Sequence, residues 1–248
     1  MLFVVANFTL AGMLLVIGVL TLKKVSHRAE LVFASLPLLF GLHQFTQGFV
    51  WLGLYHMVGP DTQHVASNLF VFYAQAILPF WVPLAIWLLE PRGPRRQAIG
   101  ALLVVGGLLM AYVAWGLVRQ PTHVSISHYS LVYFNPHTRH VWVAAVYILT
   151  TCGSLMLSRS IAIQFFGWLN LIGLLLVYFI ARYSFTALWC LYAALVSVVL
   201  YLHFIERRIA FLRALQEQET RLGSGLEEEL NQLVGLFPRL RRLFVKRT

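Results

Sequence analysis

Uncharged polar side chains recur at helical spacing in the second apolar stretch of the chain. His43, Gln47 and Trp51 are four residues apart, so a helix places them on one face, with Gln44 beside them and Gly48 allowing a close neighbour. A histidine on such a face could be an axial ligand of haem. Alternatively, these side chains form hydrogen bonds that fix helix packing. We favour the second interpretation, because His43 has no second histidine at a similar depth.

A second group of histidines lies in the connection that follows the fourth apolar stretch. Two of them, His137 and His140, are three residues apart at a predicted helix start, a spacing that could present two imidazoles to a divalent metal. No cluster of carboxylates or thiols accompanies them. We therefore expect no cofactor, with haem or a divalent metal as the alternatives. The candidate metal ligands are His123, His128, His137 and His140.

The chemistry of proton pumps and ion-coupled carriers needs ionisable groups that this chain does not place in its apolar stretches. None of the nine acidic residues falls near the middle of a stretch, and lysine occurs only at 23, 24 and 246, which excludes a retinal Schiff base within a helix. No Ser/His/Asp arrangement, HExxH, P-loop or GxGxxG is present. We expect a protein that is not an enzyme. Further polar-face candidates are Asn170, Trp189 and Cys190.

Composition explains why so many apolar residues surround these candidates. Of 248 residues, 59% are hydrophobic and only 11% are charged, and the charges fall in short clusters between long uncharged stretches. A soluble helical protein distributes charge along one face of every helix. The chain is therefore predicted to use lipid as its solvent. Its net charge of +10 suggests a lipid partner rather than nucleic acid, because the basic residues flank the apolar stretches.

The apolar stretches predict an all-α membrane protein, a bundle of seven transmembrane helices. A helix needs roughly 20 residues to cross the hydrocarbon core of a bilayer. The predicted domain covers 1–204, and its spans are 3–22, 31–57, 66–89, 98–118, 140–158, 161–181 and 183–204.

Positive charge sets the predicted orientation, because cytoplasmic loops carry more Lys and Arg. With the N-terminus outside, the outer connections hold only Arg119, Arg139 and Arg182. The inner connections hold Lys23, Lys24, Arg28, Arg92, Arg95, Arg96 and Arg159. We therefore predict an outer N-terminus and a cytoplasmic C-terminus.

Two predicted features lie outside the spans. In the connection 119–139, apolar and polar residues alternate loosely, which indicates a strand or hairpin over the helix ends. After residue 204 the last helix is predicted to extend through 205–222, and a basic amphipathic helix follows at 223–248. This helix is expected to contact inner-leaflet lipid or other membrane subunits. Its basic residues are Arg239, Arg241, Arg242, Lys246 and Arg247.

Three stretches together carry a resemblance to a family. They are ANFTLAGMLLVIGVLTL, ELVFASLPLLFGLHQFTQGFVWLGL and FTALWCLYAALVSVVLYLHF. They resemble a bacterial family of uncharacterised integral membrane proteins, a domain of unknown function, across most of 1–204 and none of the tail. That family has an MCFSA-like start, a second helix like QQxxEGxxW and an SxWC-like last helix. This chain departs from it at Leu2, His43 and Gln47, which replace Cys, Gln and Glu.

The resemblance implies a topology and no activity. We therefore expect a multi-pass protein of the bacterial plasma membrane that serves as a sensor or as an accessory subunit of a membrane complex. The alternatives are a binder or carrier of a small neutral or lipidic ligand, and a metal- or haem-binding membrane protein.

Overall fold

The structure is a computed structural model, and it describes residues 1–127, 130–180, 192, 196–202 and 205–206. The predicted seventh span, 183–204, is thus described only in part, with residues 192 and 196–202 helical. The remainder of 205–222 and all of the predicted amphipathic helix 223–248 lie outside the described residues.

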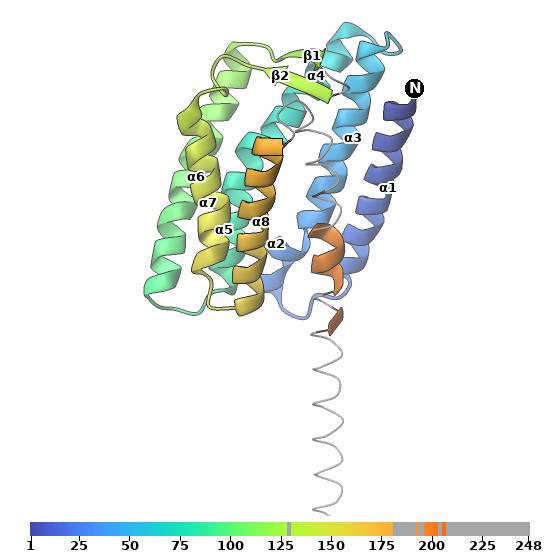
Figure 1. The fold of residues 1–248 in the computed structure, drawn as a ribbon. Helices are drawn as coiled ribbons and strands as arrows, with labels where there is room; N and C mark the ends of the chain where they lie inside the picture. The colour runs from blue at the N-terminus through green and yellow to red at the C-terminus, as the bar shows by residue number, and fades with distance from the viewer. Residues whose placement is uncertain (128–129, 181–191, 193–195, 203–204, 207–248) are drawn as a thin grey trace, which may run out of the picture. The chain divides into compact units, whose positions relative to one another are not determined.

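Helices make up most of the described chain, which confirms the predicted all-α class. The strands of the described residues form one two-stranded hairpin (Figure 1). The helices are α1 (Leu2–Leu22), the short η1 (Arg28–Glu30), α2 (Leu31–Ala34), α3 (Leu36–Leu54), α4 (Pro60–Phe72), η2 (Tyr73–Ile77), α5 (Leu78–Leu89), α6 (Pro94–Arg119), α7 (Val141–Leu157) and α8 (Ile161–Ile180). The strands are β1 (His123–Ser127) and β2 (Ser130–Phe134).

Three of the described helices are long and apolar enough to cross a membrane, by length and composition. They are Leu2–Leu22, the continuous helix Pro60–Leu89 and Pro94–Arg119. Helix α3 has 19 residues but is not among them, and it carries the polar side chains singled out above. Helices α7 and α8 are apolar but shorter where they are described. Three of the seven predicted spans therefore correspond to helices of sufficient length and apolar composition.

The second predicted span, 31–57, is helical from Leu31 to Leu54 apart from one residue. It is interrupted at Ser35, between α2 and α3, because Pro37 has no N–H to donate to the carbonyl of Phe33. Trp81 Nε1 of α5 donates to the carbonyl of Val32 at 3.2 Å and to Ser35 Oγ at 3.0 Å, so a neighbouring helix bonds to the interrupted turn.

The third predicted span begins earlier than expected, at Pro60, and contains a π-helical turn, η2. Pro79 and Pro83 follow this turn, and neither has an N–H to donate to the carbonyl four residues earlier. The carbonyl of Pro79 therefore has no α-helical donor at Pro83. Helix α6 approaches this carbonyl at Gly106, where a Cβ atom would overlap the carbonyl oxygen. The backbones of α5 and α6 therefore pack directly against each other at Gly106, with no side chain between them.

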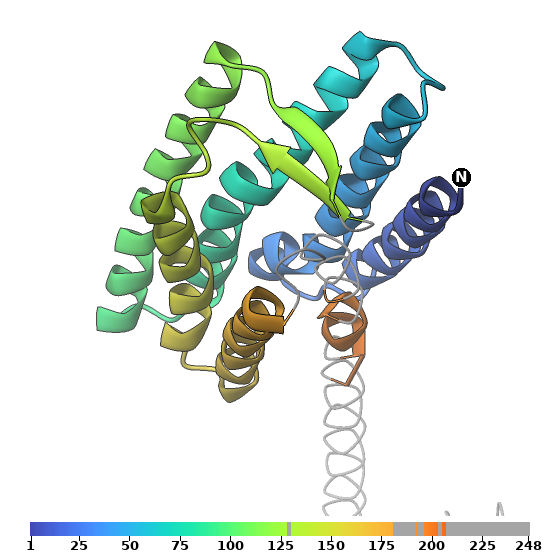
Figure 2. The same cartoon turned by 45° about the horizontal axis from the view of Figure 1, so that its top comes forward.

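The hairpin predicted in the connection 119–139 is confirmed. Strands β1 and β2 are antiparallel, with His123 opposite Phe134 and Ser127 opposite Ser130. Figure 2 shows the hairpin lying across one end of the helices. Leu131 is 3% exposed and joins a buried cluster with Val4 of α1. We call this end, which also holds the N-terminus and residues 55–59, the hairpin end (Figure 1).

The opposite end of the bundle carries most of the described positive charge, and we call it the basic end. The connections α1–η1, α5–α6 and α7–α8 meet there (Figure 1). At the hairpin end, the described Lys and Arg residues are Arg119 and Arg139, whereas Arg182 lies outside the described residues. The basic end holds Lys23, Lys24, Arg28, Arg92, Arg95, Arg96 and Arg159.

A buried carboxylate holds two connections together at the basic end. Glu90, at the end of α5, is 5% exposed. Its Oε2 accepts hydrogen bonds from Ser158 Oγ at 3.1 Å and from the backbone N–H of Arg159 at 2.9 Å. These donors precede α8, so the carboxylate bonds to backbone near the positive end of that helix. Glu90 thereby links the α5–α6 connection to the α7–α8 connection.

The two adjacent glycines of α6 offer a matched test of the α5–α6 contact. Gly106→Ala should lower the free energy of unfolding by about 1–3 kcal/mol, because the new methyl group meets backbone that cannot move aside. Gly107→Ala should be neutral or stabilising, because its Cβ meets only the Phe80 ring at an ordinary 3.6 Å. Thermal unfolding in mild detergent measures both. Equal effects of the two substitutions would contradict the close contact.

Candidate functional site

The predicted polar face of α3 points into the protein. His43, Gln47 and Trp51 are only 6%, 3% and 3% exposed, and Gln44 and Gly48 between them are also buried. A buried polar group costs free energy unless it is hydrogen-bonded. The contacts of each side chain therefore decide whether the face is a packing surface or an unfilled site.

Gln44 forms a hydrogen bond between helices α3 and α1. Its Nε2 donates to Asn7 Oδ1 of α1 at 2.7 Å, and the Nδ2 of Asn7 donates in turn to the carbonyl of Phe3 at 2.7 Å. Asn7 was not among the predicted polar residues, although an amide within the otherwise apolar stretch 3–22 is a signal for such a bond. The amide pair fixes the register of α1 against α3.

Gly48 and Trp51 extend the same contact toward the hairpin end. A Cβ on Gly48 would lie 2.8 Å from the ring of Phe8, so the glycine makes room for that ring. The indole of Trp51 stacks on Phe3 with ring centroids 4.7 Å apart. Both residues therefore pack against side chains of α1 and do not line a cavity of the described structure.

His43 lies in a column of stacked rings from three elements. Its imidazole stacks on Phe70 of α4 at 4.0 Å, and Phe70 stacks on Tyr133 of β2 at 4.2 Å. Tyr73, in the π-helical turn, lies edge-on to His43 at 6.4 Å. The Nε2 of His43 is buried and has no hydrogen-bond partner among the described residues. The column joins the middle of α3 to the hairpin.

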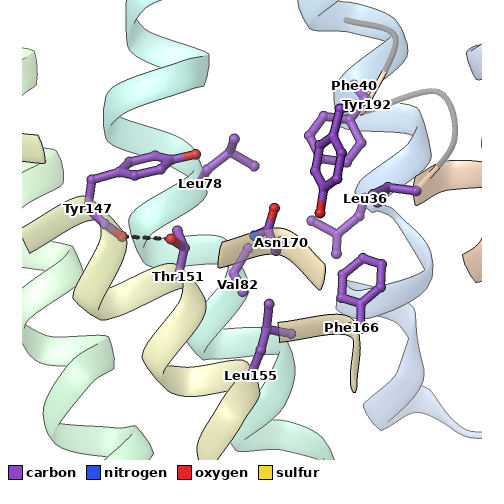
Figure 3. A pocket seen from close by; sticks show the side chains of 11 residues that line it. Leu36, Phe40, Leu78, Val82, Tyr147, Thr151, Leu155, Phe166, Asn170 and Tyr192 are labelled. Carbon is purple, nitrogen blue, oxygen red and sulfur yellow. Dashed lines mark hydrogen bonds between the residues drawn. The ribbon is translucent and has the colours of Figure 1, made fainter. Parts of the chain in front are cut away.

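A separate small cavity lies between α3, α5, α7 and α8 (Figure 3). Asn170, which the sequence analysis singled out, lines it together with Tyr147 and Thr151, which it did not. Thr151 Oγ1 donates to the carbonyl of Tyr147 at 2.7 Å, and Asn170 Nδ2 lies 3.8 Å from the sulfur of Cys152. Tyr147 and Thr151 are four residues apart in the stretch 140–158, and this helical spacing of two hydroxyl side chains could have identified them from the sequence.

Size limits what this cavity can hold. Its volume is about 30 Å³. A water molecule needs at least about 10–15 Å³, whereas a benzene-sized guest occupies a cavity of about 150 Å³. Apolar side chains make up most of the wall, among them Leu36, Phe40, Leu78, Val82, Leu155 and Phe166. As it stands, the cavity fits one or two water molecules beside the hydroxyls and the amide.

The predicted outer histidines do not form a cluster in the described structure. His137 lies edge-on to Trp115 at 5.0 Å, and His140 stacks beside Trp142 at 6.4 Å. His123 stands opposite Phe134 in the hairpin. Within the described residues there is no group of three or more His, Cys, Asp or Glu that could hold a metal ion. His128 lies outside those residues.

Several sequence candidates lie outside the described residues. They are Trp189, Cys190, Arg239, Arg241, Arg242, Lys246 and Arg247.

The described structure is thus that of a helical bundle with three membrane-length helices, uncharged polar contacts between helices and a hairpin over one end. The chain belongs to a family of unknown function, DUF6629, whose model matches residues 3–215. The predicted resemblance to a family of unknown function is confirmed, and the match continues past residue 204 into 205–222. No curated protein and no solved structure matches the chain.

The Asn7–Gln44 pair can be measured by a double-mutant cycle. Asn7→Leu and Gln44→Met should each destabilise the protein by about 1–3 kcal/mol, because each leaves a buried amide without its partner. The double variant should recover part of this loss, with a coupling of about 0.6 kcal/mol. Denaturant unfolding of the four proteins gives the coupling. Strictly additive losses would show that the amides do not interact.

His43 can be tested by a substitution that keeps the ring stack. His43→Phe should lower the free energy of unfolding by no more than about 1 kcal/mol, because it preserves stacking on Phe70 and loses only the hydrogen bond between the imidazole and the Phe70 backbone. His43→Ala is the control, and it should destabilise by about 2 kcal/mol or more through the cavity it leaves. The midpoint of thermal unfolding reports both. A His43→Phe protein as unstable as His43→Ala would mean that the imidazole holds a further partner.

Proposed function

We propose that this protein is an integral membrane protein that acts as a non-enzymatic sensor or as an accessory subunit of a membrane complex. Embedding in a bilayer is supported by the three membrane-length helices and by large apolar side chains exposed along α1, α6 and α8. Water disfavours such continuous apolar surface, whereas lipid covers it without cost. Examples are Leu2, Val5, Val16, Val104, Leu108, Phe165, Trp168 and Ile172.

The proposed orientation puts the basic end in the cytoplasm. The structure gathers the connections rich in Lys and Arg at one end of the bundle, and the positive-inside tendency assigns that end to the cytoplasm. The N-terminus and the hairpin then lie outside the plasma membrane, and the C-terminus lies inside.

The observation that carries the sensor or accessory role is the ring column His43–Phe70–Tyr133. Through Tyr133 it connects a hairpin exposed outside the membrane to the middle of α3. Through Phe70 it reaches the π-helical turn that directly follows α4, and π-helical turns occur frequently at functional sites. A partner or ligand that shifted the hairpin would therefore move side chains within the membrane. The tail 223–248 supplies a second surface for assembly inside the cell.

A second candidate function, the binding of a small neutral molecule, is favoured by the cavity beside Asn170. Its hydroxyl and amide groups suit an uncharged polar ligand. At about 30 Å³, it admits a ligand larger than water only if the helices around it move apart. We therefore place this function second.

The coupling role predicts that a tyrosine in the hairpin controls assembly. Tyr133→Ala should reduce the amount of membrane protein that co-purifies with the full chain at least fivefold, because the hairpin loses its stack on Phe70. Val132→Ala, at an exposed position of the same strand, should leave co-purification unchanged. Quantitative mass spectrometry of affinity-purified native membranes measures both. A chain that purifies alone, or partners insensitive to Tyr133→Ala, would refute the role of the hairpin.

The tail is tested separately by deletion of 223–248. If the tail provides an assembly surface, the deletion should release a co-purifying protein or change the oligomeric state while the chain remains in the membrane fraction. An unchanged complex would limit assembly to the helices and the hairpin.

A further inference from the structure

Aromatic rings of two helices and one imidazole of the β2–α7 connection gather at the hairpin end of α6 and α7. Tyr112 and Trp115 lie on the last turns of α6, and their rings are 6.1 Å apart. The ring centroid of Tyr112 also lies 4.8 Å from that of Trp142 on the first turn of α7. The imidazole of His137 lies edge-on to the Trp115 ring, with centroids 5.0 Å apart. These contacts form one connected group, which we call the α6–α7 aromatic cluster.

The cluster is open to the surroundings on one side and has a cation at its edge. Trp115 and Trp142 are 49% and 46% exposed, and Val118 and Val141 beside them are 87% and 85% exposed. The guanidinium of Arg119, the last residue of α6, lies 5.7 Å from the centre of the Trp115 ring. This distance is within the range of a cation–π contact, which orients the guanidinium while leaving its N–H donors available.

A second pair of the same kind marks the opposite end of α6. Arg96 lies 4.3 Å from the ring centre of Trp87, near the basic end. Arg96 and Arg119 are 23 residues apart in one helix, which is about 35 Å at 1.5 Å per residue. The hydrocarbon core of a bilayer is about 30 Å thick. The two arginine–tryptophan pairs therefore fit the two headgroup levels, where tryptophan and tyrosine are enriched.

We propose that the α6–α7 aromatic cluster binds the headgroup of an anionic phospholipid, with Arg119 as the ligand of its phosphate. This proposal rests on the membrane embedding proposed above. A guanidinium matches phosphate because it donates two parallel hydrogen bonds, and its contact with Trp115 holds it in place. The exposed indoles suit the boundary between headgroup and acyl chain, and Val118 and Val141 contact the chain itself.

The combination of groups favours lipid over a soluble anion or a protein partner. A site for a free anion gathers donors and excludes apolar surface, whereas here a cation sits beside two highly exposed valines. That pairing is the chemistry of an amphipathic lipid, whose charge and hydrocarbon lie a few ångströms apart. Arg139, at the same end of the bundle, instead lies 5.0 Å from the Phe134 ring of the hairpin, so it offers a matched control.

The test is a thermal-unfolding titration of the full chain, extracted from membranes in mild detergent, with phosphatidylglycerol. The wild-type protein should be stabilised, and Arg119→Gln should need about fivefold more lipid for the same shift, corresponding to one lost basic contact. Trp115→Leu should shift the titration in the same direction. Arg139→Gln removes the same charge from the same end and should titrate like the wild type. Phosphatidylcholine and inorganic phosphate should stabilise the protein less than phosphatidylglycerol.

The proposal is overturned by any of four results. Three of them are a wild-type protein that does not respond to phosphatidylglycerol, an Arg119→Gln titration equal to that of the wild type, and an equal weakening by Arg139→Gln. Stabilisation by inorganic phosphate equal to that by the lipid would overturn it in favour of a free-anion site. The membrane embedding is tested independently by cell fractionation. If the chain is not embedded in a membrane, it will be found in the soluble fraction before any lipid titration is made.

Discussion

The close approach of α1 to α3 is the contact on which the rest of the candidate site depends. At Gly18, a Cβ atom would lie 2.7 Å from the backbone nitrogen of Leu38, so the two helices nearly touch. Apolar side chains alone do not define how such a pair aligns, because lipid is as apolar as they are. The Asn7–Gln44 hydrogen bond selects one alignment. On the same face of α3, His43 lies against Phe70 of α4 and Tyr73 of η2.

Helix α4–α5 shows how prolines are accommodated where water is scarce. Every backbone group in such surroundings needs a partner, and Pro79 and Pro83 each withhold one donor. The π-helical turn η2 precedes them, and Gly106 lets α6 approach the carbonyl of Pro79. The same turn carries Tyr73, which borders the imidazole of His43. The irregular backbone is thus adjacent to the ring column through which the hairpin contacts the helices.

The two ends of the bundle differ in the side chains that they carry. The basic end gathers positive side chains and uses the carboxylate of Glu90 to bind the turn before α8. The hairpin end has few charges and is closed by aromatic rings, through Tyr133 on one side and the α6–α7 aromatic cluster on the other. In the proposed function, signals from outside reach the helices through the first group, and in the proposed lipid site the second group holds the helices at the lipid surface.

The helical class, a strand or hairpin in the connection 119–139, the placing of His43 and Gln47 on one helix face and the resemblance to a family of unknown function could be predicted from the sequence, because they follow from local periodicity and motif. The burial of that face and the partners of its side chains depend on the tertiary structure. Asn7 became the partner of Gln44, and Phe70 and Tyr133 became neighbours of His43, through contacts between segments distant in the chain. Spacing along one helix specifies a face, whereas a partner depends on how neighbouring helices are packed and rotated against it.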